Sequence, residues 1–89
     1  VGDSVIGRNV NLGSGTKIAN LRLDEGIIHV VLKGRMVSTG RRKLGAIIGD
    51  NVKTGINSVI NTGTIVGEDS FIGPGARVSG FIAPHSRVM

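Results

Sequence analysis

The 89-residue sequence predicts an all-β fold in which the chain winds into a triangular coil of stacked parallel strands. Residues 48–83 divide into six consecutive hexads, with a β-branched residue at every first position and mostly small residues at the fifth. A six-residue period fits neither an α-helix nor an alternating strand. One flat side and one corner per hexad instead give a turn of three hexads, and neighbouring turns bury the apolar side chains of one another.

Each hexad position has an expected role. The first side chain points inward and stacks on its equivalents in the next turns, which would lie about 4.8 Å away. The small fifth residue fits near a corner, and Gly or Asn at position two serves the bend. The 15 glycines recur at fixed offsets and are therefore assigned to corners. A ladder of Ile and Val fills such a coil without Trp or Tyr, which the sequence lacks.

The repeat begins at the start of the chain. Residues 1–5 are one residue short of a hexad, and residues 6–23 form a first full coil. Over nine regular hexads the first position is apolar in eight, and Thr54 is the exception. Because the sequence starts with Val inside a repeat, we expect residues 1–89 to be one β-helix domain taken from a longer chain.

The repeat is interrupted from about residue 24 to 46, and this segment predicts an inserted β-hairpin. Residues 27–32 and 35–38 are rich in apolar and β-branched side chains and flank the pair Lys33-Gly34, which is typical of a two-residue turn. Such a hairpin is too short to fold alone, so it should lean on the coil or on a neighbouring subunit. Insertions that return to a solenoid in register commonly lie on its binding face.

The net charge of +5 attracts anions, and the densest cationic run, residues 41–43, directly follows the hairpin. These side chains could clamp a phosphate; the alternative is a solvated charge run beside an edge. Phosphorylated small molecules are favoured over nucleic acid, since no aromatic residues are interleaved with the cations. The absence of cysteine, signal sequence and apolar span favours a cytoplasmic protein without a membrane partner or a thiolate metal site.

The hexads resemble the hexapeptide-repeat family, which implies a single-stranded left-handed parallel β-helix that usually trimerises. Residues 1–20 and 43–52, with the signatures at 19–22 and 40–45, are more narrowly similar to the C-terminal acetyltransferase domain of archaeal bifunctional sugar-1-phosphate nucleotidylyltransferases, which make UDP-N-acetylglucosamine. The resemblance implies N-acetylation of glucosamine 1-phosphate by a homotrimer, with acetyl-CoA as co-substrate. Magnesium would serve only the nucleotidylyltransferase domain, outside this chain.

Four residues are candidates for the amino-sugar phosphate. Asn11 and Asn20 match asparagines that hydrogen-bond the amino sugar and the incoming acetyl group in this family. Lys43 matches the lysine that binds the sugar phosphate, and Arg42 lies beside it in the cationic run. Asn is also common at coil corners for conformational reasons, because it tolerates positive φ.

Three further residues are candidates for the coenzyme. Ser14 and Gly15 occupy the turn whose backbone faces the thioester of acetyl-CoA in the family. Arg87 resembles an arginine near the end of the coil that contacts the coenzyme, although the spacing is shorter here. An ordinary basic C-terminal tail is the alternative reading of Arg87.

The catalytic group itself is expected outside the sequence. The general-base histidine of the family, followed three residues later by a tyrosine, would fall upstream of Val1, so the 89 residues alone should be inactive. His29 and His85 do not occupy that position and are interpreted as surface residues. A non-catalytic trimerisation domain is the main alternative. A γ-type carbonic anhydrase would need three zinc-binding histidines, and the sequence has two.

Overall fold

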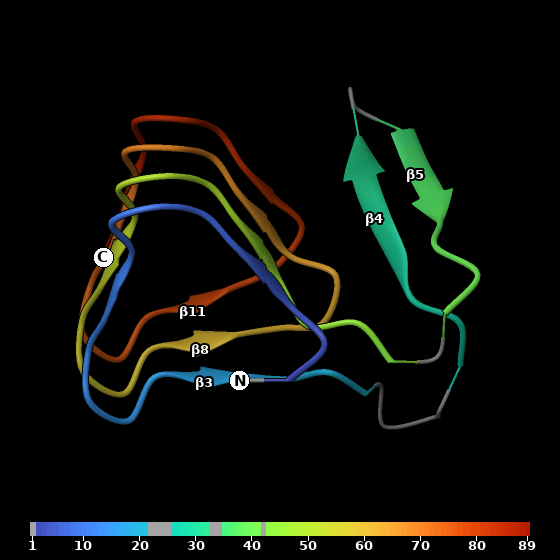
Figure 1. The fold of residues 1–89 in the computed structure, drawn as a ribbon, viewed down its shortest axis with the longest axis horizontal. Helices are drawn as coiled ribbons and strands as arrows, with labels where there is room; N and C mark the ends of the chain where they lie inside the picture. Colours follow the sequence, from blue (N-terminus) through green and yellow to red (C-terminus); the bar gives the residue numbers. More distant parts are fainter. Residues whose placement is uncertain (1, 22–25, 33–34, 42) are drawn as a thin grey trace.

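The computed structural model describes residues 2–21, 26–32, 35–41 and 43–89, and it confirms the left-handed parallel β-helix with an inserted β-hairpin (Figure 1). In the described part of the chain every regular element is a strand. The coil contains β1 (Val5–Ile6), β2 (Asn11–Leu12), β3 (Lys17–Ile18), β6 (Ile47–Ile48), β7 (Lys53–Thr54), β8 (Val59–Ile60), β9 (Ile65–Val66), β10 (Phe71–Ile72), β11 (Arg77–Val78), β12 (Phe81–Ile82) and β13 (Arg87–Val88).

These strands form the three parallel sheets of a triangular prism. Face A is the outer surface of β1-β6-β9-β12, face B that of β2-β7-β10-β13, and face C that of β3-β8-β11. The corners between them are named AB, BC and CA. Ile47 pairs with Ile65, which follows it by three hexads, so the predicted turn of three hexads is confirmed.

The interior contains the side chains that the hexad pattern places there. The first positions form one buried set and the fifth positions another. Buried first positions include Ile48, Ile60, Val66, Ile72 and Val78, and buried fifth positions are Val52, Ser58, Thr64, Ser70 and Ala76. Because the fifth residues are small, they leave room for the branched first residues of the other two sides of the triangle.

Thr54, the polar exception at a first position, is buried, and its hydroxyl has a partner. Thr16 Oγ1 lies 2.9 Å from Thr54 Oγ1 and donates to the carbonyl oxygen of Gly13 at 2.7 Å. The Gly13 N–H also approaches Thr54 Oγ1 at 3.2 Å. Pairing of this kind removes most of the cost of burying a hydroxyl, and it ties Thr54 to the turn at corner BC.

The expected role of position two in the bend is wrong. Residues with positive φ lie at position four of the hexads between residues 48 and 77: Asn51, Asn57, Gly63, Asp69 and Gly75. Glycine at position two is needed for space, since a Cβ on Gly55 would lie 2.5 Å from the backbone nitrogen of Pro74 in the next coil. The bend and the close approach of coils are therefore served by different positions.

The sixth predicted hexad, residues 78–83, is not complete. Only Ser79 and Gly80 separate β11 from β12, and Gly80 turns the chain with a φ of 75°. Phe81 consequently pairs with Ile65, 16 residues earlier, and Ile82 takes an inward first position instead of a fifth position. The shortened corner brings Phe81 to face A.

The hairpin consists of β4 (His29–Leu32) and β5 (Arg35–Ser38), which pair antiparallel from His29–Ser38 to Leu32–Arg35. The first strand begins two residues later than expected; Lys33 and Gly34 lie outside the described residues. Figure 1 shows the hairpin standing outside the triangle of the coil. Its base packs against the coil at Ile28, which is 1% exposed, and β4 contacts β12.

Candidate functional site

Face B carries two of the residues singled out in the sequence. Asn11 pairs with Lys53, Lys53 with Phe71, and Phe71 with Arg87, so all four side chains lie in one outward column. Asn11 begins this column in the first coil, and Arg87 ends it in the last. The guanidinium carbon of Arg87 lies 5.6 Å from the centroid of the Phe71 ring, at the range of a cation–π contact.

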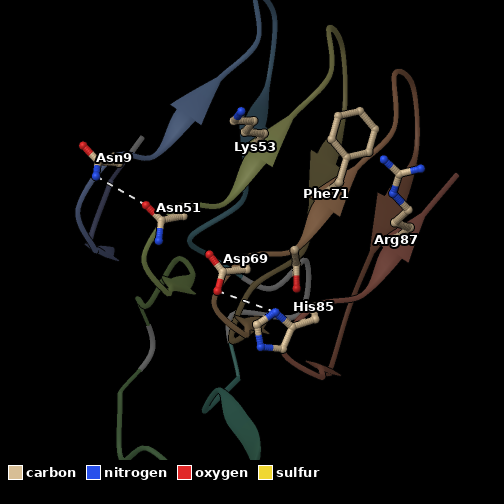
Figure 2. Close-up of a pocket in the computed structure, with 8 residues that line it drawn as sticks. Asn9, Asn51, Lys53, Asp69, Phe71, His85 and Arg87 are labelled. Carbon is tan, nitrogen blue, oxygen red and sulfur yellow. Dashed lines mark hydrogen bonds and ion pairs between the residues drawn. The ribbon is translucent and has the colours of Figure 1, made fainter.

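A cavity of about 720 Å³ extends from this column to corner AB. Figure 2 shows Phe71 and Arg87 side by side, with Lys53 on the neighbouring strand. At the corner, the Nδ1 atom of His85 lies 3.5 Å from an Asp69 carboxylate oxygen. The remaining lining residues are Asn9, Asn51 and Ser70. Two cations beside an aromatic ring form a surface suited to an anionic group attached to an apolar or planar body.

Among the eight lining residues, sequence reasoning singled out only Arg87 as a site residue, and it missed Lys53, Phe71 and His85 among others. Lys53 and Phe71 both occupy the sixth position of a hexad and are 18 residues apart, so reading that position once per turn places them together. His85 could not be placed in the same way, because the shortened corner at Ser79–Gly80 shifts the register of the last coil.

Ser14 and Gly15 lie at corner BC of the first coil, and both are exposed. Gly15 has a φ of 75°, and its carbonyl oxygen accepts a hydrogen bond from Lys17 Nζ at 3.0 Å. The Ser14 carbonyl oxygen accepts from the Asn57 N–H of the next coil at 2.9 Å. The turn is therefore fixed by contacts with the next coil, through Asn57 and through the half-buried Thr16 and buried Thr54 hydroxyls.

Asn20 and Lys43 lie together at corner CA, where the hairpin segment leaves and rejoins the coil. The N–H of Leu44 donates to the Asn20 carbonyl oxygen at 2.9 Å, and Leu21 forms an antiparallel bridge with Lys43. The Lys43 side chain is exposed, while Asn20 is half-buried. Arg42, the other phosphate candidate, lies outside the described residues.

The structure thus separates the candidates of one copy into two groups. Asn11, Ser14 and Gly15 lie on face B and at corner BC, whereas Asn20 and Lys43 lie across face C at corner CA. The three strands of face C, with Lys17 and Arg77 in its outward column, stand between the two groups. One copy alone does not bring all five residues around a single small ligand.

The two histidines belong to neither group of candidates. His29 is an exposed residue of β4, and His85 belongs to corner AB. Among the described residues, no three His, Asp or Glu side chains come close enough to hold a metal ion. Within the same residues, no helix has the length and apolar character needed to cross a membrane.

Residues 45–80 match the family model described as bacterial transferase hexapeptide (six repeats). This segment covers the three strands of the second coil, those of the third and the shortened corner. Residues 45–80 are therefore similar to hexapeptide repeats, which agrees with the coil geometry and with the buried first and fifth positions.

Its relatives point to a narrower group. The chain is 56% identical over 79 residues to the bifunctional sugar-1-phosphate nucleotidylyltransferase/acetyltransferase of Sulfurisphaera tokodaii, covering 89% of the chain and 20% of the relative. It is 48% identical to the bifunctional protein GlmU of Methanococcus maripaludis over 99% of the chain and 21% of the relative. For GlmU of Methanocaldococcus jannaschii the identity is 49%, over 82% of the chain and 18% of the relative. The chain spans about a fifth of these archaeal relatives and matches their C-terminal portion.

Proposed function

We propose that the chain is the acetyltransferase domain of a bifunctional sugar-1-phosphate nucleotidylyltransferase and transfers the acetyl group of acetyl-CoA to glucosamine 1-phosphate. The observation that carries this proposal is the similarity, over 89% of the chain, to a protein whose name states both activities. The corner that carries both Asn20 and Lys43 supports it, because an amide and a cation at one corner suit the amine and the phosphate of one small sugar.

The reaction forms a C–N bond and breaks a C–S bond. The sugar amine attacks the thioester carbonyl, and the amine proton passes to a general base. The base then gives this proton to the departing sulfur, so that coenzyme A leaves as a thiol. That base is the histidine that the family resemblance implies upstream of Val1. Lys43 would hold the phosphate, and the backbone N–H groups at Ser14 and Gly15 would stabilise the oxyanion of the tetrahedral intermediate. Nucleotidyl transfer and its magnesium would belong to the part of the protein outside this chain.

The proposal includes a homotrimer in which each site lies between two copies. This arrangement is supported by the separation of the candidate residues within one copy. One group lies on face B and at corner BC, and the other lies at corner CA. In a trimer, a second copy can bring its corner CA residues to the face B residues of the first. Corner CA of one copy would then meet face B and corner BC of the next. We also propose a cytoplasmic location, as expected from the sequence.

Face A supports the same arrangement. Its outward column consists of Val5, Ile47, Ile65 and Phe81, paired in register, without a charged side chain. Val5 is 62% exposed and Phe81 48% in the single copy. The columns of faces B and C both contain cations, so face A is the side of the prism most suited to contact another copy.

The test is acetyl-CoA consumption by the full-length protein with glucosamine 1-phosphate. The Lys43→Ala variant should lose about 100-fold or more in kcat/KM while keeping the trimer, because Lys43 is proposed to position the substrate phosphate. Arg77→Ala, which removes an exposed cation from face C, is the matched control and should keep its activity. A trimer without turnover on any amino-sugar phosphate would instead identify a non-catalytic trimerisation domain.

A further inference from the structure

The carboxylate of Asp3 holds the side chain of Asn20. Asn20 Nδ2 donates a hydrogen bond to Asp3 Oδ2 at 2.9 Å. A carboxylate only accepts hydrogen bonds, so the NH₂ end of the Asn20 amide must be the end that faces Asp3. The carboxylate thereby fixes the orientation of the amide and turns its carbonyl oxygen away from Asp3. The negative charge also strengthens the bond.

Asp3 is itself held in place by the segment that follows Lys43. It has a φ of 52°, and its carbonyl oxygen accepts the N–H of Gly45 at 2.9 Å. The next residue, Ser4, accepts the Ala46 N–H on its hydroxyl at 3.0 Å and donates to the Gly2 carbonyl oxygen at 3.0 Å. The position of the carboxylate is therefore set by backbone contacts on both sides.

Asn20 meets the same returning segment through its main chain. Its carbonyl oxygen accepts the N–H of Leu44, beside the bridge between Leu21 and Lys43. Asp3 thus links the side chain of Asn20 to the segment that carries Lys43. The two proposed substrate contacts at corner CA, Asn20 and Lys43, share one framework, and Asp3 contributes the carboxylate that bonds to Asn20.

We propose that Asp3 is a positioning residue for the amino sugar. It orients Asn20 so that Oδ1 is presented to an N–H or O–H donor of the substrate, and it keeps this acceptor at a fixed place relative to the Lys43 segment. Asp3 acts through Asn20 and does not itself touch the substrate. The inference rests on the proposed function, since it assigns a partner to a residue proposed to bind the amino sugar.

The test compares Asp3→Gly and Asp3→Asn in the full-length protein. Both Gly and Asn adopt the left-handed conformation of residue 3 without strain, so neither substitution disturbs the backbone. Asp3→Gly removes the acceptor and should lower kcat/KM for glucosamine 1-phosphate by about 10-fold or more, with the KM for acetyl-CoA changed by less than about two-fold. Asp3→Asn keeps an oxygen that Asn20 can bind, so its loss should be smaller.

A double-mutant cycle separates positioning from a general structural effect. If Asp3 acts through Asn20, the variant with both Asp3→Gly and Asn20→Ala should be no worse than Asn20→Ala alone. Asp50→Ala is the control, because Asp50 also accepts a hydrogen bond between coils, from the Arg8 N–H at 2.7 Å, but at corner AB. This control should keep the kinetic constants of the wild type.

Three results would overturn the inference. Asp3→Gly with wild-type kinetics, or losses that add in the double variant, would remove the positioning role while leaving the acetyltransferase function in place. An inactive wild-type protein would refute the proposed function and the role of Asp3 with it. These failures are distinguishable because only the last affects the unmodified protein.

Discussion

At the scale of single residues, the glycines of the coil have two separate functions. Gly55, at position two of its hexad, faces the backbone of Pro74 so closely that a Cβ would overlap it. Gly75, at position four, has a φ of 70°, and a Cβ there would meet no atom within 4 Å. The first glycine is needed for the spacing of coils, and the second for the conformation of the corner.

This difference predicts unequal effects of substitution. Gly55→Ala should lower the free energy of unfolding by about 2 kcal/mol or more, because two coils must move apart. Gly75→Asn should change it by less than about 1 kcal/mol, since Asn adopts positive φ and the space is open. Chemical denaturation at one protein concentration measures both variants. Equal losses would contradict the assignment of separate functions.

At the scale of elements, the six-residue period was sufficient to predict the coil. Inward stacking of first and fifth positions is a local rule repeated in every hexad, so residues 48–77 follow it without exception. The shortened corner after Val78 could not be predicted in the same way, because the apolar pair Phe81-Ile82 fits an inward position in either register. Only the pairing with Ile65 and Val66 shows which register the last coil adopts.

The candidate site was less predictable than the fold. The sequence indicates which residues match the family, but the hydrogen bond from Asn20 to Asp3 joins residues 17 positions apart through the geometry of a corner. The cavity at Phe71 and Arg87 likewise depends on which residues fall in one outward column. Such contacts follow from the exact register of the coils, which composition and motif spacing do not specify.

A buried isoleucine helps to anchor the hairpin at its base. Ile28 is 1% exposed, and its backbone is bonded to the Thr39 N–H and the Arg41 carbonyl oxygen across the base. Its side chain also lies against Gly63 of the coil, where a Cβ would approach Ile28 Cγ2 at 2.9 Å. Ile28 therefore contributes to the attachment of the hairpin to the coil, together with Val30 of β4, which is 7% exposed.

Ile28→Ala should cost about 2–4 kcal/mol at this contact, because it leaves a cavity between hairpin and coil. We expect amide hydrogen exchange to become much faster in β4 and β5 while the coil strands keep their protection. Ile27→Ala is the matched control, since Ile27 is 38% exposed. Unchanged exchange in the hairpin of the Ile28 variant would show that other contacts hold it.

At the scale of the whole molecule, the apolar column of face A predicts how copies associate. Ile47→Lys places a charge in the middle of this column and should shift the trimer toward monomer, because the lysine would be buried without a partner. Val59→Lys makes the same change on face C and should leave the trimer intact. Light scattering at micromolar concentration measures both, and dissociation by the face C variant alone would contradict the assignment.

The central claim is that one active site combines residues of two copies, and mixing two inactive variants tests it most directly. Asn11→Ala and Lys43→Ala subunits are unfolded together, refolded as mixed trimers and assayed for acetyl transfer to glucosamine 1-phosphate. If corner CA of one copy completes the site on face B of the next, each site needs an intact Lys43 from one copy and an intact Asn11 from its neighbour. In an equal mixture about a quarter of the sites have both, so about a quarter of the wild-type activity should return. Mixed trimers that remain inactive, with wild-type trimers active after the same treatment, would show that the site does not form between copies.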